Sequence, residues 1–428
     1  MSKTTTSETP AATAAPTGGT RRERLAGAAG ALGGAVIAGL PLSVDGQEAA
    51  PARPVVPADP TKLQGGATTQ VGTRSPFETP TRAPYGETVG NSLTPLQDLT
   101  GVITPSDLHF ERHHAGIPAI DPERHTLTIH GLVDRPLTFT LDDLKRFPQV
   151  VRTYFIECSG NGRASYRDPK PEMTPQKVSG MISTSEWTGV PLATLFREVG
   201  ASPKAKWFLA EGGDACLMTR SVPIAKAYDD AMIVWAQNGE PLRPAQGYPM
   251  RLLLPGWEGN INVKWLRRIE LGMAPWMTRW ETSKYTDPRL DHKADMFTFV
   301  QQPKSIITTP GYPREVKGRG WHSVNGLAWT GRGKITRVEV STNGGKSWAD
   351  AELLGEVRPK AAVRFQTMWE WTGDEAILLS RATDETGEVQ PTRTALIAKR
   401  GIGTDYHFNQ IVGWKVERTG KVFFHGET

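Results

Sequence analysis

Alternating apolar and polar residues predict strands and tight turns in the first folded part of the chain. Residues 152–158 alternate and are rich in β-branched and aromatic side chains, which predicts a strand, and the Ser-Gly-Asn-Gly run at 159–162 predicts a turn. Residues 127–137 predict another strand with a turn. Thr140 suits the N-cap of a short helix over 141–147, and residues 193–199 predict a second helix. This part is therefore expected to mix strands with short helices.

The last third of the chain has the pattern of strands alone. Residues 333–348 read as an alternating strand, an Asn-Gly-Gly turn and a second strand, which predicts a hairpin. Short alternating segments follow at 365–372 and 376–384, with turn residues between them. This spacing favours an all-β sandwich over residues 296–428, as in immunoglobulin-like modules.

Length and composition fit two folded domains. A chain of 428 residues is too long for one ordinary core. Charged residues make up 22% and hydrophobic residues 38%, as in folded soluble proteins, and the 44 glycines and 33 prolines favour strands and loops. The net charge of +5 is modest and spread along the chain, so no nucleic-acid-binding surface is expected.

The N-terminus has the features of an export signal. Residues 1–20 are rich in Ser, Thr, Ala and Pro and are expected to be disordered. The segment 20–25, which contains Arg21-Arg22, resembles a twin-arginine signal, and 26–40 is too short and glycine-rich for a membrane span. We expect an export signal with a disordered N-terminus over 1–50, a periplasmic location and an extended arm over 51–97. The alternative is a chance arginine pair in a disordered tail.

Cysteine usage restricts the redox chemistry. Cys158 and Cys216 are the only cysteines, so the chain has no disulfide framework, no Cys-x-x-Cys-His haem site and too few thiolates for a metal cage. Any redox chemistry must use a non-covalent cofactor. From the residues alone, Cys158 is either a metal-holding thiol at the end of a strand or a small buried thiol.

Two separated motifs resemble the sulfite oxidase family. The Cys-Ser-Gly-Asn-Gly-Arg sequence at 158–163 is similar to the family's Cys-Ala-Gly-Asn-Arg-Arg loop, whose cysteine binds molybdenum beside molybdopterin. The Phe-Glu-Arg-His-His sequence at 110–114 is similar to the family's Phe-Val-Arg-Asn-His segment, and the 46 positions from Arg112 to Cys158 are close to the family interval. The resemblance implies an α+β fold: a mixed α/β molybdopterin domain over 98–295, then an immunoglobulin-like dimerisation sandwich over 296–428.

The resemblance also implies site residues, with molybdenum on Cys158. Trp235 stands where the family has an active-site tyrosine, and Arg364 is the candidate for the dimerisation-domain arginine that reaches the site. Gln246 and Asn262 replace histidines found in many relatives. The implied catalytic residues are Arg112, Cys158, Arg163, Trp235 and Arg364. The implied cofactor-binding residues are Phe110, Arg112, His114, Cys158, Asp214, Gln246, Arg251, Asn262, Val263 and Lys264.

Within the family, the 108–118 segment, the export signal and the lack of a haem motif most resemble the molybdenum subunits of Sox-type sulfane (sulfite) dehydrogenases. That resemblance implies oxidation of sulfane sulfur on a carrier protein, or of sulfite, at a molybdenum-molybdopterin centre. It implies a c-type cytochrome as electron acceptor and a homodimer within a heterotetramer. The alternatives are a dehydrogenase for free sulfite, a reductase of the same fold and a non-catalytic exported binding module.

Overall fold

The computed structural model describes residues 59–62 and 64–428. The chain divides into two units, residues 1–68 and 69–428. In the first unit, the described residues include one 3-10 turn, η1 (Pro60–Lys62), beside which the Asp59 carboxylate accepts hydrogen bonds from Thr61. The expected export signal lies outside the described residues. Within the described part of the chain, no helix is long and apolar enough to cross a membrane.

The second unit begins with a small sheet that carries the first cofactor motif. Its strands follow the order β1-β2-β3, all antiparallel, with the bounds β1 (Ala83–Gly86), β2 (Gly90–Leu93) and β3 (Glu111–His113). Gly86 lies at a φ of +76° in the β1–β2 turn, where a Cβ would meet the Val89 carbonyl oxygen at 2.5 Å. The last part of the expected extended arm is thus folded, and Leu96 in that part is buried in the core. Backbone pairing with β3, 18 or more residues later, orders a segment that has no periodicity of its own.

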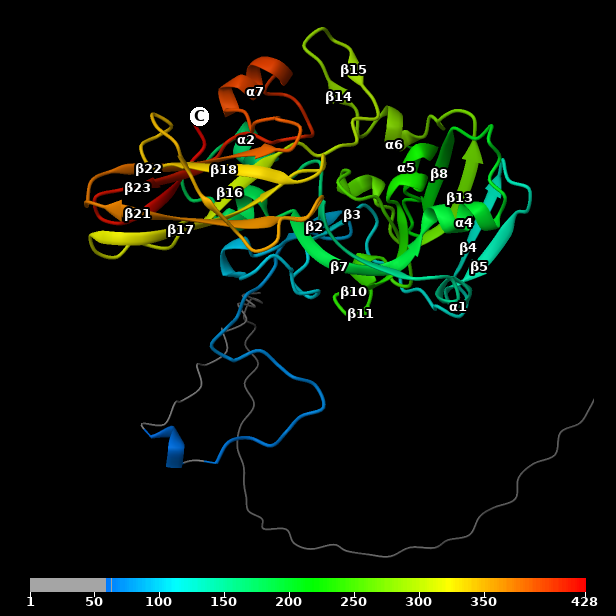
Figure 1. Ribbon diagram of the computed structural model, residues 1–428, viewed down its shortest axis with the longest axis horizontal. Coiled ribbons are helices and arrows are strands. Elements are labelled where there is room, and N and C mark those ends of the chain that lie inside the picture. Colours follow the sequence, from blue (N-terminus) through cyan, green and yellow to red (C-terminus); the bar gives the residue numbers. More distant parts are fainter. Residues whose placement is uncertain (1–58, 63) are drawn as a thin grey trace, which may run out of the picture. The chain divides into compact units, whose positions relative to one another are not determined.

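Two five-stranded sheets form the mixed domain (Figure 1). One has the order β11-β10-β7-β6, with β12 also paired to β10, and the other has the order β5-β4-β13-β8-β9, in which only β4 and β13 are parallel. The first comprises β6 (Val150–Glu157), β7 (Ile182–Pro191), β10 (Met232–Gln237), β11 (Glu240–Pro241) and β12 (Arg251–Leu253). The second comprises β4 (Thr126–Gly131), β5 (Leu137–Thr140), β8 (Trp207–Gly212), β9 (Thr219–Pro223) and β13 (Leu266–Gly272).

Short helices connect these strands, and one hydrophobic core joins the two sheets. The core cluster includes Ile129 of β4, Phe208 of β8, Ile233 of β10 and Phe196 of a helix, all fully buried. Thr140 caps the first helix in a capping box with Asp143. The helices in the described residues are α1 (Leu141–Lys145), α2 (Arg163–Arg167), α3 (Pro175–Ser179), α4 (Leu192–Glu198), α5 (Ile224–Asp229), α6 (Arg279–Thr282) and α7 (Arg393–Arg400), with the 3-10 turns η2 (Leu96–Asp98), η3 (Pro244–Gln246) and η4 (Gly259–Ile261).

The C-terminal part is a β sandwich, which Figure 1 shows beside the mixed domain, and it also contains the helix α7, so the expectation of strands alone is corrected. Trp329, Phe365 and Trp414 are fully buried in one core cluster shared by its two sheets. One sheet comprises β16 (Lys304–Thr309), β17 (Gly320–Trp329), β20 (Glu352–Leu354) and β21 (Val363–Trp371), and the other comprises β18 (Ile335–Ser341), β19 (Ala349–Asp350), β22 (Ala376–Asp384), β23 (Gly413–Val416) and β24 (Val422–His425). A hairpin of β14 (Asp287–Pro288) and β15 (Ala294–Asp295) precedes it. The predicted fold class, a mixed domain followed by a sandwich, is confirmed.

A buried carboxylate joins the sandwich to the mixed domain. Glu157 is the last residue of β6 and is 2% exposed. Its Oε1 accepts from the Lys304 ammonium of β16 at 3.0 Å and from the Asn161 amide at 2.9 Å, and its Oε2 accepts from the Trp329 indole of β17 at 2.7 Å. A buried charge needs such partners. The sandwich therefore fixes the end of β6, one residue before Cys158.

Candidate active site

A cavity of about 70 Å³ lies where the β3 segment, the end of β6 and the η3–η4 region meet. It is lined by polar and charged side chains from segments more than 150 residues apart. The lining residues that the sequence predicted are Phe110, Arg112, His114, Cys158, Asp214, Gln246, Arg251, Asn262, Val263 and Lys264. The fold therefore brings together all ten predicted cofactor-binding residues, while their individual roles stay predictions.

Cys158 lies at the cavity wall because the chain turns sharply after β6. Its backbone N–H donates to the Met181 carbonyl, and its own carbonyl accepts from the Asn161 N–H, closing the turn. Gly162 then takes a φ of +99° as α2 begins, a conformation that other residues rarely adopt. Burial raises the pKa of the Cys158 thiol, and the charges of Arg112 and Arg163 act in the opposite direction. The thiol therefore lines the cavity together with Arg112.

The described residues hold no group of three or more His, Cys, Asp or Glu side chains arranged for a metal ion. A metal at Cys158 would therefore depend on ligands that the chain does not supply. A dithiolene cofactor supplies sulfur ligands, and sulfur ligands suit a soft metal. The donor set fits molybdenum held jointly by Cys158 and a pterin.

Two buried cations line the other end of the cavity. Arg251 is 3% exposed and donates to the backbone carbonyls of Gln246 and Asn262, at 3.0 and 2.9 Å. Burial lowers its pKa to about 9, and burial also lowers the pKa of Lys264 well below its usual range. Neither forms an ion pair with a carboxylate within the described structure. Two buried cations without a carboxylate partner favour an anionic ligand, so a pterin phosphate fits here.

Tyr285, which the sequence reasoning missed, faces the same cavity from the segment after α6. Its hydroxyl lies 2.7 Å from Nε2 of His114, and burial raises its pKa. Burial lowers the pKa of His114 to about 3, so the imidazole is neutral and shares one proton with the phenol. The cavity thus contains a tyrosine, although the resemblance had assigned the family's tyrosine position to Trp235. No local sequence pattern identifies Tyr285 as a site residue. A search for a tyrosine in the segment between the two domains could have found it.

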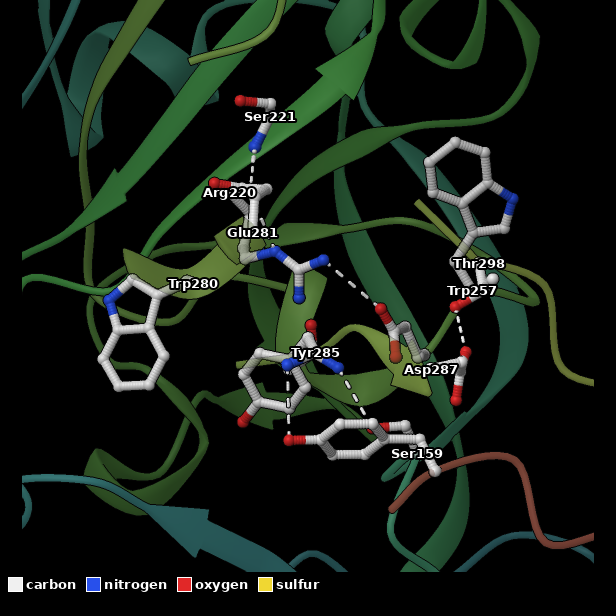
Figure 2. Close-up of polar contacts among 12 residues, drawn as sticks. Ser159, Arg220, Ser221, Trp257, Trp280, Glu281, Tyr285, Asp287 and Thr298 are labelled. Carbon is white, nitrogen blue, oxygen red and sulfur yellow. Dashed lines mark hydrogen bonds and ion pairs between the residues drawn. The ribbon is translucent and has the colours of Figure 1, made fainter. Parts of the chain in front are cut away.

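An ion-pair cluster buries the outer face of Tyr285 (Figure 2). The Arg220 guanidinium lies 5.0 Å from the centre of the Tyr285 ring. It pairs with Glu281 at 3.1 Å and with Glu258 at 3.3 Å, and all three side chains are at most 2% exposed. Figure 2 shows Glu281 also accepting from the Ser221 N–H, at 2.8 Å. One cation thus pairs with two buried carboxylates and fixes the wall behind the tyrosine.

Three predicted catalytic residues do not line the cavity. Trp235 packs in the hydrophobic core of the mixed domain and is 8% exposed. Arg364 donates to the Gly101 and Leu99 carbonyls, at 2.6 and 2.7 Å, which holds it away from the site. Arg163 lies near the Cys158 loop, but its guanidinium donates to the Asp405 carbonyl at 2.6 Å. Only Arg163 of the three is close to the predicted metal ligand.

Cys216, the second cysteine, lies beside the cavity rather than in it. Its thiol donates to the Asp214 carboxylate at 2.8 Å, and burial together with that carboxylate raises its pKa to about 12. We expect Asp214→Asn to speed alkylation of Cys216 by iodoacetamide at pH 8 by about tenfold, because loss of the negative charge stabilises the thiolate by roughly one pKa unit. Peptide mass spectrometry would follow the rate, with the exposed Asp168→Asn as control. An unchanged rate would show that the carboxylate does not control the thiol.

Comparisons with known proteins identify the family of both domains. Residues 114–280 match the oxidoreductase molybdopterin binding domain family, and residues 297–413 match the Mo-co oxidoreductase dimerisation domain family. The crystal structure of the sulfane dehydrogenase SoxCD from Paracoccus pantotrophus is similar, with a TM-score of 0.81 and 42% identity, covering 85% of this chain and 97% of that chain. Sulfite oxidase from Gallus gallus is 30% identical over 69% of each chain.

Longer relatives match over only part of their length. An NADH nitrate reductase from Ulva prolifera is 30% identical over 70% of this chain but 39% of its own length, and mitochondrial sulfite oxidase from Mus musculus is 30% identical over 72% of this chain and 61% of its own length. The fold, the site and these matches define a molybdopterin-binding oxidoreductase with a dimerisation domain. The chain belongs to the sulfite oxidase family, as the two motifs predicted.

Proposed function

We propose that this enzyme oxidises sulfur, either sulfane sulfur on a carrier protein or sulfite, in the periplasm, and passes electrons to a c-type cytochrome. The observation that carries the proposal is the convergence of Cys158, Arg112 and Tyr285 at one cavity that also holds two buried cations. The likeness to a sulfane dehydrogenase over 97% of that chain supports sulfur as the substrate element. The arginine pair Arg21-Arg22 supports export.

Each part of the site has a distinct task in this proposal. Cys158 holds the metal, and Arg251 and Lys264 hold the phosphate of the pterin. The bound cofactor supplies an oxygen atom to sulfur and accepts two electrons. Arg112 donates to the Gly90 carbonyl at 3.1 Å while it lines the cavity, so its orientation is fixed before a substrate enters. Its positive charge attracts the oxygens of an anionic substrate and stabilises charge that develops on the product.

Tyr285 and His114 are the proton-carrying pair of the cavity. Oxygen transfer from water to sulfur releases protons, and one can pass through the Tyr285 hydroxyl to Nε2 of the neutral His114 imidazole, which accepts it and later returns it. The hydrophobic and ion-pair walls around Tyr285 keep this exchange apart from bulk water. A phenol in this position also replaces the role that the resemblance assigned to Trp235.

The partners belong to the same proposal. The dimerisation domain supports a homodimer, and the likeness to a chain of SoxCD supports a cytochrome subunit that completes a heterotetramer. A carrier protein with sulfane sulfur is the substrate that we favour. Free sulfite is the second candidate, because sulfite oxidase from Gallus gallus is 30% identical over 69% of each chain.

The proposal predicts about one molybdenum and one pterin per chain in protein purified without oxygen. It also predicts a higher kcat/KM with carrier-bound sulfane sulfur than with sulfite when cytochrome c is the acceptor. Metal analysis, pterin fluorescence and stopped-flow reduction of cytochrome would measure these quantities. Protein from cells grown with tungstate is the matched control and should reduce little cytochrome. A higher kcat/KM with sulfite would favour the second candidate, and failure with both substrates would refute sulfur oxidation.

A further inference from the structure

Four side chains form a continuous polar chain from the N-terminal hairpin to the buried ammonium of Lys264. Arg82, just before β1, forms an ion pair with Glu111 Oε1 at 3.2 Å. The other oxygen of Glu111 lies 3.1 Å from Nε2 of His113. The opposite nitrogen of that ring, Nδ1, lies 3.0 Å from Lys264 Nζ. This series of side-chain contacts therefore ends at Lys264, one of the two cations that line the cavity.

The bonding pattern assigns the protons of His113. When Lys264 is protonated, its ammonium has donors only, and Nδ1 of His113 then accepts from it. A neutral imidazole that accepts at Nδ1 carries its proton on Nε2, and that proton points to the Glu111 carboxylate. Glu111 thereby selects the tautomer in which His113 can accept from Lys264. Without Glu111 the ring could take the other tautomer, which would present a donor to the ammonium.

In the described structure, the Lys264 ammonium has no further hydrogen-bond acceptor nearby that could replace His113. Its other hydrogen bonds go to the backbone carbonyls of Arg112 and Ala245, at 3.2 and 2.9 Å, so His113 is its only side-chain hydrogen-bond partner in the described structure, beside a cation–π contact with the Trp265 ring at 4.5 Å. Because the ammonium is buried, loss of an acceptor there leaves a desolvated donor unpaired, and the side chain would turn to find another partner. The direction of Lys264 thus depends on His113.

Glu111 and His113, the two middle residues of this series of contacts, lie at positions where this sequence differs from the Phe-Val-Arg-Asn-His motif. Glu111 takes the place of valine and His113 takes the place of asparagine. The structure pairs these two departures with each other, and Arg82 from the preceding hairpin neutralises the carboxylate that one of them introduces. Either residue alone would leave a polar side chain with an unpaired hydrogen-bonding atom, whereas the two together complete the series of hydrogen bonds.

We propose that Arg82, Glu111 and His113 are positioning residues that direct Lys264 toward the anionic end of the cofactor, so that the N-terminal hairpin controls how firmly the cofactor is retained. The inference rests on the cofactor assignment of the proposed function and not on the substrate. Arg82 also donates to the His109 carbonyl at 3.3 Å, so the hairpin and the cofactor segment move together. Loosening the hairpin would loosen the hold of Lys264 on its ligand.

Cofactor loss from the diluted holoenzyme tests the inference without any substrate. Released pterin would be followed by fluorescence and released molybdenum by metal analysis. We expect Glu111→Val to release cofactor about 3–10 times faster than the natural chain, as one hydrogen bond to a cofactor-holding group allows. Arg82→Gln, a partly exposed change with little risk to folding, should speed release about 2–3 times.

The decisive variant combines Glu111→Val with His113→Asn, which restores the motif. An asparagine amide oxygen can accept from Lys264 without help from residue 111, so release should return to within about twofold of the natural rate. Arg74→Gln is the matched control, because Arg74 ties the same N-terminal segment to Asp107 at 2.6 Å without reaching Lys264, and its release rate should be unchanged.

Three results would overturn the inference: natural release rates in both Glu111→Val and Arg82→Gln, a double variant that loses cofactor as fast as Glu111→Val alone, or equally fast release from Arg74→Gln. A holoenzyme that keeps its cofactor yet oxidises no sulfur would refute the proposed substrate and leave this test intact. A chain purified without molybdenum or pterin would refute the cofactor assignment and this inference together.

Discussion

Cys158→Ser is expected to give a folded protein that still holds pterin but turns over at least about a hundredfold more slowly. A hydroxyl is a much poorer ligand than a thiolate for a soft metal, while the side-chain volume hardly changes. The main chain of Cys158 donates to the Met181 carbonyl and accepts from the Asn161 N–H, and the substitution keeps both hydrogen bonds, so the turn should survive the change. Turnover with cytochrome as acceptor, pterin fluorescence and thermal unfolding would be measured on the same preparation.

The chain supplies its own control for this change. Cys216→Ser removes the only other thiol, and a serine hydroxyl can still donate to Asp214. Its turnover is expected to stay within about twofold of the natural chain. Natural turnover in Cys158→Ser would remove Cys158 from the metal, and a similar loss in both variants would point to general thiol damage instead.

Arg220→Met is expected to destabilise the protein by about 3–5 kcal/mol. The change keeps much of the side-chain length but leaves Glu258 and Glu281 buried with no cation within bonding distance. The same loss should disturb the wall behind Tyr285, so the residual activity of the folded fraction should fall as well. Denaturant unfolding with a fixed m-value would give the free energy.

Arg337→Met is the matched control for that experiment. Arg337 also pairs with two carboxylates, Glu339 and Asp350, but its side chain is 53% exposed. Solvent screening limits such pairs to about 1 kcal/mol or less. Equal costs for the two variants would mean that burial does not set the value of the Arg220 cluster.

Local patterns were enough to predict most of the secondary structure around the site. The alternation at 152–158 became β6, which ends one residue earlier at Glu157. The Thr140 cap predicted the start of α1, although the helix ends at Lys145 rather than 147. These features depend on neighbours in sequence, such as the hydroxyl that accepts from the Asp143 N–H. The hairpin over 83–93 could not be predicted in this way, because its order comes from pairing with β3.

Site residues could be predicted where a sequence motif identified both the residue and the direction of its side chain. They could not be predicted where the assignment depended on the register of a strand. Successive side chains of a strand point to opposite faces, so an error of one position exchanges core for cavity. Val234 and Trp235 indeed lie in different hydrophobic clusters, and the pairing register shifts between residues 234 and 236. No feature of the sequence announces such a shift, so Trp235 was assigned to the site while Tyr285, 50 residues later, occupies it.

The carboxylate between the two domains also constrains when the cofactor site can form. The ammonium of Lys304 and the indole of Trp329 bind Glu157 from 147 and 172 residues further along the chain. During synthesis the Cys158 turn therefore leaves the ribosome long before the groups that hold it in place. Until the sandwich has folded, Glu157 would remain hydrated and the turn unfixed. The cofactor must then be loaded after the whole polypeptide has been synthesised. Assembly of the molybdopterin site is therefore post-translational.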